Sequence, residues 1–328
     1  MKDKISLTKN RIFRFLSIAG IANFGIEFQK NRLQILTYHG LCAEEDIKHD
    51  WISSNFVTIR EFDKQMSIVR KYMSPISLEE GVACLKNKRQ LPPRSVAVTF
   101  DDGYRNNVIL GGPVLKKYKI PATIFLSTEH INNQEFFHFD KYYILYYLVQ
   151  DEFIDEKILQ GPDLFNYKKK SVYKIKKGLE SIWREAEVFV SNKMRSVLAP
   201  LSWDEITHCD ELFSFGSHTR SHAILAHLNY TEKKEEIFQS IHEVASRLKV
   251  TSVPFSYPNG NEQDFDHEDI KLLQQANALC AATMINGSNG KGKNLFKLNR
   301  RGISRGFTVD AFMLELAGIR GLFSFISG

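Results

Sequence analysis

Residues 95–104 read SVAVTFDDGY, an apolar run that ends on two adjacent carboxylates and a glycine. The first six residues are apolar or β-branched, which is typical of a strand buried on both faces of a parallel sheet. Asp101 and Asp102 follow at once, and Gly103 permits a tight turn or a positive φ. Because neighbouring residues of an extended chain point in opposite directions, we expect the two carboxylates to serve different partners. A plain strand-ending turn is the alternative interpretation.

Apolar strand-like segments alternate with helical segments in both directions along the chain. Strands are expected at 33–38, 95–100, 121–126, 212–215, 252–257 and 278–285. Helices are expected at 61–73, 78–88, 107–119, 231–249 and 267–277. Alternating strands and helices indicate βαβ units and a mostly parallel sheet, so the predicted class is α/β. Six or seven such units predict a closed or nearly closed barrel, with an open doubly wound sheet as the alternative.

The chain has 328 residues, which fits one α/β barrel or two modest domains. One region interrupts the alternation: 130–200 is rich in aromatic residues and then in lysine, and we expect a helical insertion there. Its lysine run is interpreted as a solvated face rather than an anion-binding surface. We therefore predict an amphipathic or helical segment at 1–30, followed by a barrel at 31–328 that carries the insertion.

Composition excludes several classes of protein. A formal net charge of +6 is too weak to indicate nucleic acid as a partner, although it is compatible with an anionic ligand or a membrane surface. Four scattered cysteines form neither a disulfide framework nor a thiolate zinc site. No apolar run approaches the ~18–20 residues needed to span a bilayer. The apolar ends of the chain leave peripheral membrane contact open, with packing on the protein's own core as the alternative.

Polar side chains follow several of the expected strands. They are His39, the Asp101–Asp102 pair, the 216–222 segment and the 258–260 segment. A barrel would bring these ends to one rim. His218 and His222 are spaced i, i+4, so a helical turn would put both imidazoles on one face. Together with a carboxylate they could bind zinc or a similar divalent metal, whose charge would also offset the crowding of two carboxylates. Two surface or capping histidines are the alternative.

Several motifs occur here in an ordered series. They are TFDDG at 99–103, PATIFL at 121–126, LSWDEI at 201–206, SHTRSH at 217–222 and FSYPNG at 255–260. In this order they resemble the polysaccharide deacetylase family, the carbohydrate esterases of family 4, over roughly residues 33–304. The resemblance implies a distorted (β/α)7-type barrel and a divalent metal, with Zn²⁺ expected and Co²⁺, Ni²⁺ or Fe²⁺ as alternatives.

The resemblance also implies roles for individual residues. Asp102, His218 and His222 would hold the metal. Asp101 would be the general base that activates a water for attack on an acetyl carbonyl. The backbone N–H of Tyr104 would help the metal to stabilise the oxyanion.

The third motif departs from the family pattern. The family carries an arginine there that orients the base, whereas this chain has Ser256. Arg300 is the predicted replacement and Arg301 the second choice, and a surface charge is the alternative for either. The rest of the motif is expected to contact substrate through Tyr257, Pro258 and Asn259.

The family's late Leu-x-His motif, which supplies a general acid, is missing, because no histidine follows Asn294. LTYHG at 36–40 instead resembles an N-terminal Tyr-His motif of exopolysaccharide deacetylases of the biofilm type. In those relatives the barrel looks circularly permuted and this histidine is the acid. The resemblance thus implies that His39 is the general acid that protonates the leaving amine, and that the barrel is circularly permuted. A structural role is the alternative for a lone histidine at a strand end.

These features predict a metal-dependent hydrolase that removes N-acetyl groups from an amino sugar of a cell-surface polysaccharide or its lipid-linked precursor. An O-acetyl esterase and a glycan-binding protein without activity are the alternatives. Since the N-terminus shows basic residues but no clear cleavage site, we expect the protein in the bacterial cytoplasm or at the inner membrane, with the periplasm as the alternative.

Overall fold

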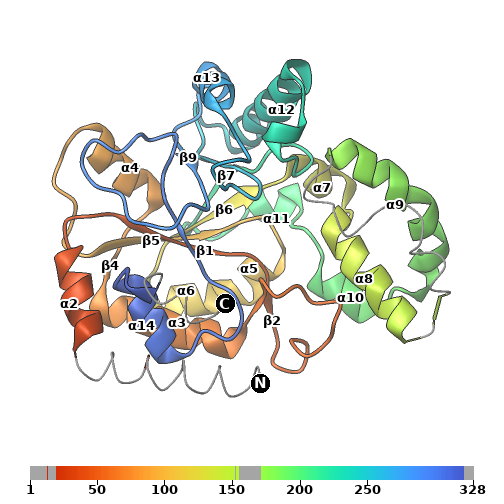
Figure 1. The fold of residues 1–328 in the computed structure, drawn as a ribbon, viewed down its shortest axis with the longest axis horizontal. Helices are drawn as coiled ribbons and strands as arrows, with labels where there is room; N and C mark the ends of the chain where they lie inside the picture. The colour runs from red at the N-terminus through yellow and green to blue at the C-terminus, as the bar shows by residue number, and fades with distance from the viewer. Residues whose placement is uncertain (1–12, 14–19, 152, 155–170, 321–328) are drawn as a thin grey trace.

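The computed structural model describes residue 13 and residues 20–151, 153–154 and 171–320. At its centre lies a sheet of eight strands, seven of which follow one path in the order β10-β1-β5-β6-β7-β8-β9, while β4 pairs with β5 beside it (Figure 1). All pairings within this sheet are parallel. The strands are β1 (Gln34–Tyr38), β4 (Ser74–Pro75), β5 (Ser95–Phe100), β6 (Ala122–Leu126), β7 (Phe213–Ser217), β8 (Phe255–Ser256), β9 (Ala281–Ala282) and β10 (Arg301–Gly302). A separate parallel pair joins β2 (Leu41–Cys42) and β3 (Val57–Thr58).

The two ends of the seven-strand path meet through residues 298–302. Ala282 of β9 forms a parallel bridge with Leu298, and the Arg300 N–H donates to the Ile285 carbonyl at 3.1 Å. On its other side Arg301 is in register with Leu36 of β1. The sheet therefore curves into a nearly closed seven-stranded barrel, as expected, and the alternative of an open doubly wound sheet is wrong. The circular permutation stays a prediction.

Helices follow most strands and cover the barrel. They are α2 (Ile21–Phe28), α3 (Ile59–Tyr72), α4 (Leu78–Lys86), α5 (Asn106–Ile109), α6 (Gly111–Tyr118), α7 (Thr128–Asn133), α8 (His138–Gln150), α9 (Val172–Ala186), α10 (Asn192–Val197), α11 (Trp203–Thr207), α12 (Tyr230–Leu248), α13 (His267–Gln275) and α14 (Val309–Leu316), with short 3-10 turns η3 (Glu187–Phe189) and η4 (Leu225–His227). Figure 1 shows α12 and α13 on one side of the sheet and α3, α6 and α14 on the other.

Local sequence explains where these helices begin. Thr58 and Glu61 form a capping box at the start of α3, and Asn229 and Glu232 form another at the start of α12. Such reciprocal bonds satisfy backbone N–H groups that have no partner within the helix. The helix expected over 107–119 is divided at Leu110 into α5 and α6. Pro113 lies in the first turn of α6, where its missing N–H costs nothing.

The barrel strands are buried throughout. Every residue of β1, β5 and β6 is buried, which matches their continuous apolar sequences. Burying one such Val, Leu, Ile or Phe side chain contributes about 1.5–3 kcal/mol. The buried core thus stabilises the barrel and sets the positions of the strand ends.

The segment between β6 and β7 contains helices α7 to α11, with η3 among them (Figure 1, right). Its helices contribute Leu145, Leu179, Trp183 and Met194 to a second apolar cluster, which is distinct from the main barrel cluster and also takes in residues before and after β5 such as Phe56 and Tyr104. This arrangement agrees with a helical insertion, whereas the proposed domain boundaries stay a prediction.

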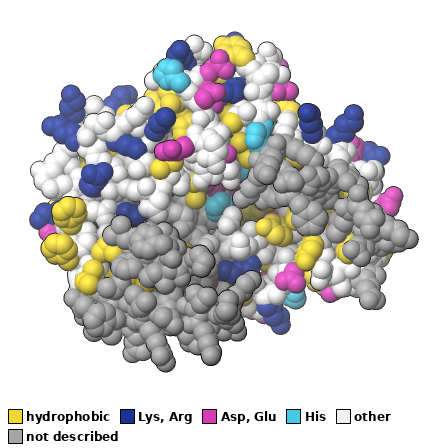
Figure 2. All heavy atoms as spheres, viewed as in Figure 1, with side chains coloured by type: hydrophobic (Ala, Val, Ile, Leu, Met, Phe, Trp, Pro, Cys, Tyr) yellow, Lys and Arg dark blue, Asp and Glu magenta, His cyan; other side chains and the backbone are white. Residues whose placement is uncertain are grey.

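Most of the predicted 1–30 segment lies outside the described residues, but its last part forms α2, which packs on α14. Among the described residues, no helix combines the length and apolar character that a membrane span requires. On the face shown in Figure 2, Lys and Arg side chains are spread around the periphery and interspersed with other groups. The proposed membrane contact stays a prediction.

Candidate active site

A cavity of about 490 Å³ opens where β1, β5, β7 and β8 end. We call it the strand-end cavity. Seven of the residues singled out in the sequence line it: His39, Asp101, Asp102, Tyr104, His218, His222 and Asn259. The barrel thus brings together side chains from four distant segments of the chain, as the position of each at a strand end predicted.

Asp102, His218 and His222 form a compact group of donor atoms. The Nε2 atoms of His222 and His218 lie 3.2 and 3.6 Å from Asp102 Oδ1, and the three candidate ligand atoms lie within 4.8 Å of one another. Asp102 Oδ1 is buried and has no hydrogen-bond partner. A buried carboxylate oxygen without a donor is unfavourable by itself. These residues therefore fit a divalent cation, and an oxygen with two imidazole nitrogens is a ligand set that suits zinc.

The second nitrogen of His218 fixes the orientation of its ring. His218 Nδ1–H donates to the Ser256 carbonyl at 2.7 Å, which leaves the Nε2 lone pair directed at Asp102. Burial is the largest cause that lowers the pKa of His218, to about 4. The ring is therefore neutral at ordinary pH, as a metal ligand must be.

The backbone around these ligands differs from what the spacing suggested. Residues 218–222 form a loop and not a helical turn, and Thr219 and His222 have left-handed φ values of 60° and 59°. The helical-turn prediction is wrong; the loop itself brings the two rings to 4.9 Å. Asp102 is also left-handed, with φ 76°, so a turn rather than strand alternation separates the two carboxylates. Gly103, at φ 89°, continues this turn as expected.

A buried carboxylate on α12 braces the loop. Glu236 is fully buried, and its Oε2 accepts the Ser221 N–H at 2.8 Å while its Oε1 accepts the Ser221 hydroxyl at 2.6 Å. The Tyr173 hydroxyl of α9 donates to the same Oε1 at 2.7 Å. The sequence analysis missed Glu236. A signal existed, because this glutamate stands in the apolar stripe of α12 next to Ile237.

Asp101 is paired with Arg300. Arg300 Nη1 and Nη2 donate to the two oxygens of Asp101, each at 2.7 Å. Arg300 is itself fixed by bonds from Nε to the Thr283 carbonyl and from Nη2 to Ser256 Oγ, both at 2.8 Å. Burial is the largest single influence and would raise the pKa of Asp101, but the charge and hydrogen bonds of Arg300, together with His218 and His39, outweigh it and hold that pKa well below its usual range. Arg300, and not Ser256, thus supports Asp101, in the geometry expected of an orienting arginine.

The second choice, Arg301, points elsewhere. It pairs with Glu315 at 3.4 Å and bonds to Gln29 and Asn286. It therefore ties α14 to the N-terminal region and takes no part in the strand-end cavity.

His39 lies across the strand-end cavity on the end of β1. Its Nδ1 is buried without a hydrogen-bond partner, and its carbonyl accepts from Asn107 Nδ2 at 2.6 Å. The Tyr104 N–H makes no hydrogen bond to the described residues, while its hydroxyl donates to Asp140 of α8 at 2.7 Å. Both residues line the strand-end cavity, and their proposed roles stay predictions.

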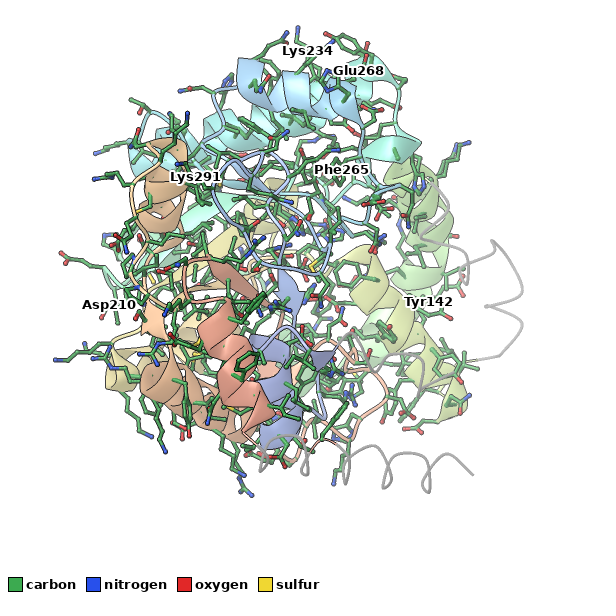
Figure 3. All side chains as sticks on the ribbon, turned by 60° about the vertical axis from the view of Figure 1, so that its left-hand side comes forward. Tyr142, Asp210, Lys234, Phe265, Glu268 and Lys291 are labelled. Carbon is green, nitrogen blue, oxygen red and sulfur yellow. The ribbon has the colours of Figure 1, made fainter. Side chains whose placement is uncertain are left out.

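Of the three residues predicted to contact substrate, one lines the strand-end cavity and two do not. Tyr257 is 1% exposed, stacks on Phe265 (labelled in Figure 3) with ring centroids 4.1 Å apart, and donates to the Phe296 carbonyl. It is a core residue and, like the buried Pro258, does not line the strand-end cavity, so the structure does not support the expected contact from either side chain. Asn259 does line it, and its amide is fixed by Asp264 at 2.7 Å.

The sequence analysis also missed one wall of the strand-end cavity. Helix α8 contributes His138, Phe139 and Tyr143, and α9 contributes Val172 and Ile175. No motif marks these residues, because only the folded insertion carries them to the strand ends.

Comparison with known proteins gives a consistent result. The family model described as "Polysaccharide deacetylase" matches residues 88–278. A poly-beta-1,6-N-acetyl-D-glucosamine N-deacetylase of Staphylococcus epidermidis is 30% identical over 181 residues, which cover 52% of this chain and 60% of that protein. A protein of the same name from Staphylococcus aureus is 26% identical over 128 residues, covering 35% of this chain and 42% of that one. The match thus spans less than two thirds of these relatives.

Solved structures share the fold. The Streptococcus pyogenes deacetylase PplD, in complex with acetate, aligns with a TM-score of 0.61 at 17% identity, covering 88% of this chain and 99% of that one. IcaB from Ammonifex degensii aligns with a TM-score of 0.58 at 17% identity, covering 88% and 97%. Since the family model matches more than half of the chain, and its strand-end residues are assembled in the barrel, the protein belongs to the polysaccharide deacetylase family.

Proposed function

We propose that this protein is a metal-dependent hydrolase that removes N-acetyl groups from a cell-surface polymer of N-acetylglucosamine. One observation carries the proposal: Asp102, His218 and His222 line one cavity together with Asp101, whose carboxylate is paired with Arg300 behind it. A group of metal ligands and a separate ionised carboxylate are what metal-assisted hydrolysis of an amide needs. The names of the staphylococcal relatives support the polymer as the substrate class.

Asp102 and the two histidines would hold the cation, and a bound divalent cation supplies Lewis acidity that polarises the carbonyl and makes a water more acidic. Asp101 stays ionised because of Arg300, and its carboxylate is oriented to accept the proton of that water. Its low basicity suffices when the water is already acidified. The Tyr104 N–H donates to the carbonyl oxygen as negative charge develops there.

The second half of the reaction breaks the carbon–nitrogen bond, and the amine must leave with a proton. His39 lies on the same cavity and carries a ring that can donate one. Acetate and a free amino sugar are the products. Water supplies one oxygen of acetate and gives a proton to Asp101, while His39 gives a proton to the departing amine. Exchange of protons with solvent returns both side chains to their starting states.

Acetate release tests the proposal. The metal-free protein is prepared with a chelator, reloaded with Zn²⁺, Co²⁺, Ni²⁺ or Fe²⁺, and supplied with N-acetylated and O-acetylated glycans in parallel. Release from the N-acetylated polymer that depends on metal supports the proposal. Release from O-acetylated glycan alone identifies an esterase, and glycan binding without release identifies a binding protein.

Two finer expectations belong to the same proposal. A lipid-linked precursor as substrate is distinguished from finished polymer by supplying each to the purified protein. A place in the cytoplasm or at the inner membrane is tested by fractionation of the cells, with recovery in the periplasmic fraction as the contrary result.

A further inference from the structure

A second cavity, of about 630 Å³, lies within the helical insertion. We call it the insertion cavity. Its walls come from α7, α8, α9, η3, α10 and the loops beside them, and its lining includes His130, Phe136, Lys141, Lys177, Trp183 and Arg184. Nothing in the proposed reaction uses these residues, although the insertion cavity is larger than the strand-end cavity.

The two cavities are neighbours. His138 of α8 lines both of them. From the same helix Phe139 and Tyr143 line the strand-end cavity, whereas Lys141 lines the insertion cavity. Helix α8, marked by Tyr142 in Figure 3, is thus the partition between them. A glycan with one sugar in the strand-end cavity could therefore place another of its sugars in the neighbouring insertion cavity.

The insertion cavity combines an apolar wall with polar groups. The Trp183 indole meets the Phe136 ring edge-on, with centroids 5.7 Å apart, and the Lys141 ammonium lies 5.3 Å from the Trp183 ring. His130 is 2% exposed, and its Nε2 has no hydrogen-bond partner. A pyranose ring has apolar faces and a hydroxyl edge, so an apolar wall with a few polar groups suits it. A sugar hydroxyl would also satisfy a buried nitrogen that is otherwise unpaired.

The charge of the lining indicates which sugar fits. Five Lys or Arg side chains face three glutamates: Lys141, Lys176, Lys177, Arg184 and Arg195 against Glu135, Glu180 and Glu187. Lys141, Arg184 and Arg195 pair with these glutamates, and Lys176 pairs with Glu129 outside the lining. The remaining positive excess lies at Lys177. A deacetylated amino sugar carries an ammonium group, which this excess repels, whereas an N-acetylated sugar is neutral.

We propose that the insertion cavity binds a second, still N-acetylated sugar of the glycan chain whose reacting sugar occupies the strand-end cavity, and disfavours one that is already deacetylated. This inference rests on the proposed function and adds to it. The protein would thereby select its substrate by the acetylation of a neighbouring unit as well as of the reacting one.

The experiment compares two β-1,6-linked N-acetylglucosamine tetramers, one fully acetylated and one with a single residue deacetylated. The ratio of their kcat/KM values is measured for the wild type and for Lys177→Glu/Arg184→Glu, which replaces two exposed cations of the lining. We expect the wild type to favour the acetylated tetramer and the variant to lose about threefold to tenfold of that preference. Lys174→Glu is the matched control, since it is exposed on α9 but does not line the cavity. Its ratio should equal that of the wild type.

An unchanged ratio in the double variant, with circular dichroism and bound metal as in the wild type, would overturn the inference while leaving the proposed function intact. Binding of the same tetramers to Asp101→Asn protein, measured by calorimetry, separates the two ideas further. If the wild type releases no acetate from either tetramer, the proposed function fails. If binding still prefers the acetylated tetramer, and this preference depends on Lys177 and Arg184, the inference about the insertion cavity is retained.

Discussion

Arg300 holds Asp101 through two parallel hydrogen bonds of 2.7 Å, although 199 positions separate them in the sequence. The bidentate pair is fully buried and keeps the carboxylate ionised. Ser256 completes the arrangement, because its hydroxyl accepts from Arg300 and its carbonyl accepts from His218. One small residue therefore links the supports of Asp101 and of the metal ligands.

Replacing Arg300 should move the pH profile in a defined direction. In the wild type Arg300 holds the pKa of Asp101 low, so the base stays ionised well below neutral pH. In Arg300→Gln the strongest influence that opposes burial is lost, so that pKa should rise and the acidic limb of kcat/KM should shift upward by about one pH unit or more. Arg301→Gln is the control and should leave the limb in place. If the acidic limb of Arg300→Gln does not shift, Asp101 is not the group whose titration produces that limb.

The same pair should contribute to stability in a pH-dependent way. A carboxyl whose pKa is lowered on folding stabilises the protein above its unfolded pKa, and this contribution is lost as the pH falls toward the folded value. The free energy of unfolding contributed by Asp101 should thus be present at neutral pH and fall in strong acid. Urea titrations of wild type and Asp101→Asn measure it, if they extend from neutral pH to well below the ordinary aspartate pKa of about 3.9. The difference between them should shrink toward acid pH, and a difference that grows would contradict the assignment.

Loss of a ligand should strongly weaken metal binding. Asp102→Ala removes the only oxygen donor of the group, and His218→Ala removes a nitrogen that Ser256 orients. Each should lower metal affinity by about 100-fold or more, with activity lost in parallel. Metal content after dialysis and calorimetric titration check this. An Asp102→Ala protein that retains a full equivalent of metal would overturn the ligand assignment.

Glu236→Gln tests the brace behind the metal loop. The amide cannot accept both Ser221 bonds as the carboxylate does, so the loop that carries the two histidines should loosen. Metal affinity should fall by about 10-fold to 100-fold, the usual effect of losing a group that supports a ligand. The adjacent Glu235 is exposed, so Glu235→Gln is a matched control that should bind metal normally. Equal affinity in both variants would reduce Glu236 to a role in stability alone.

His39→Ala should separate binding from proton donation. Metal affinity should be unchanged, because His39 is not one of the three ligand residues, while hydrolysis of the amide should slow by about 10²–10⁴-fold. An acetyl ester with a strongly acidic leaving group needs no proton and should lose much less. Comparison of the two substrates by acetate release is the measurement. Equal losses on both would assign His39 a role in binding or positioning rather than in proton donation.

Much of the site was accessible from the sequence because of where its residues stand. Asp101, His39 and His218 each follow an apolar strand, and parallel strands deliver their ends to one rim. The prediction failed where backbone conformation is set by long-range contacts. The 218–222 segment has helical spacing but forms a loop, in which the Ser221 N–H bonds to Glu236 rather than along a helix.

The sequence by itself determined the alternation of buried strands and helices, and with it the barrel and the strand-end positions of the polar residues. Periodicity and burial are local properties, so they can be recognised in a single chain. Only the tertiary structure decided that Arg300 rather than Arg301 meets Asp101, that Glu236 braces the metal loop, and that α8 divides two cavities. These relationships join residues far apart in sequence, and packing of the whole barrel, not the propensity of any segment, fixes them.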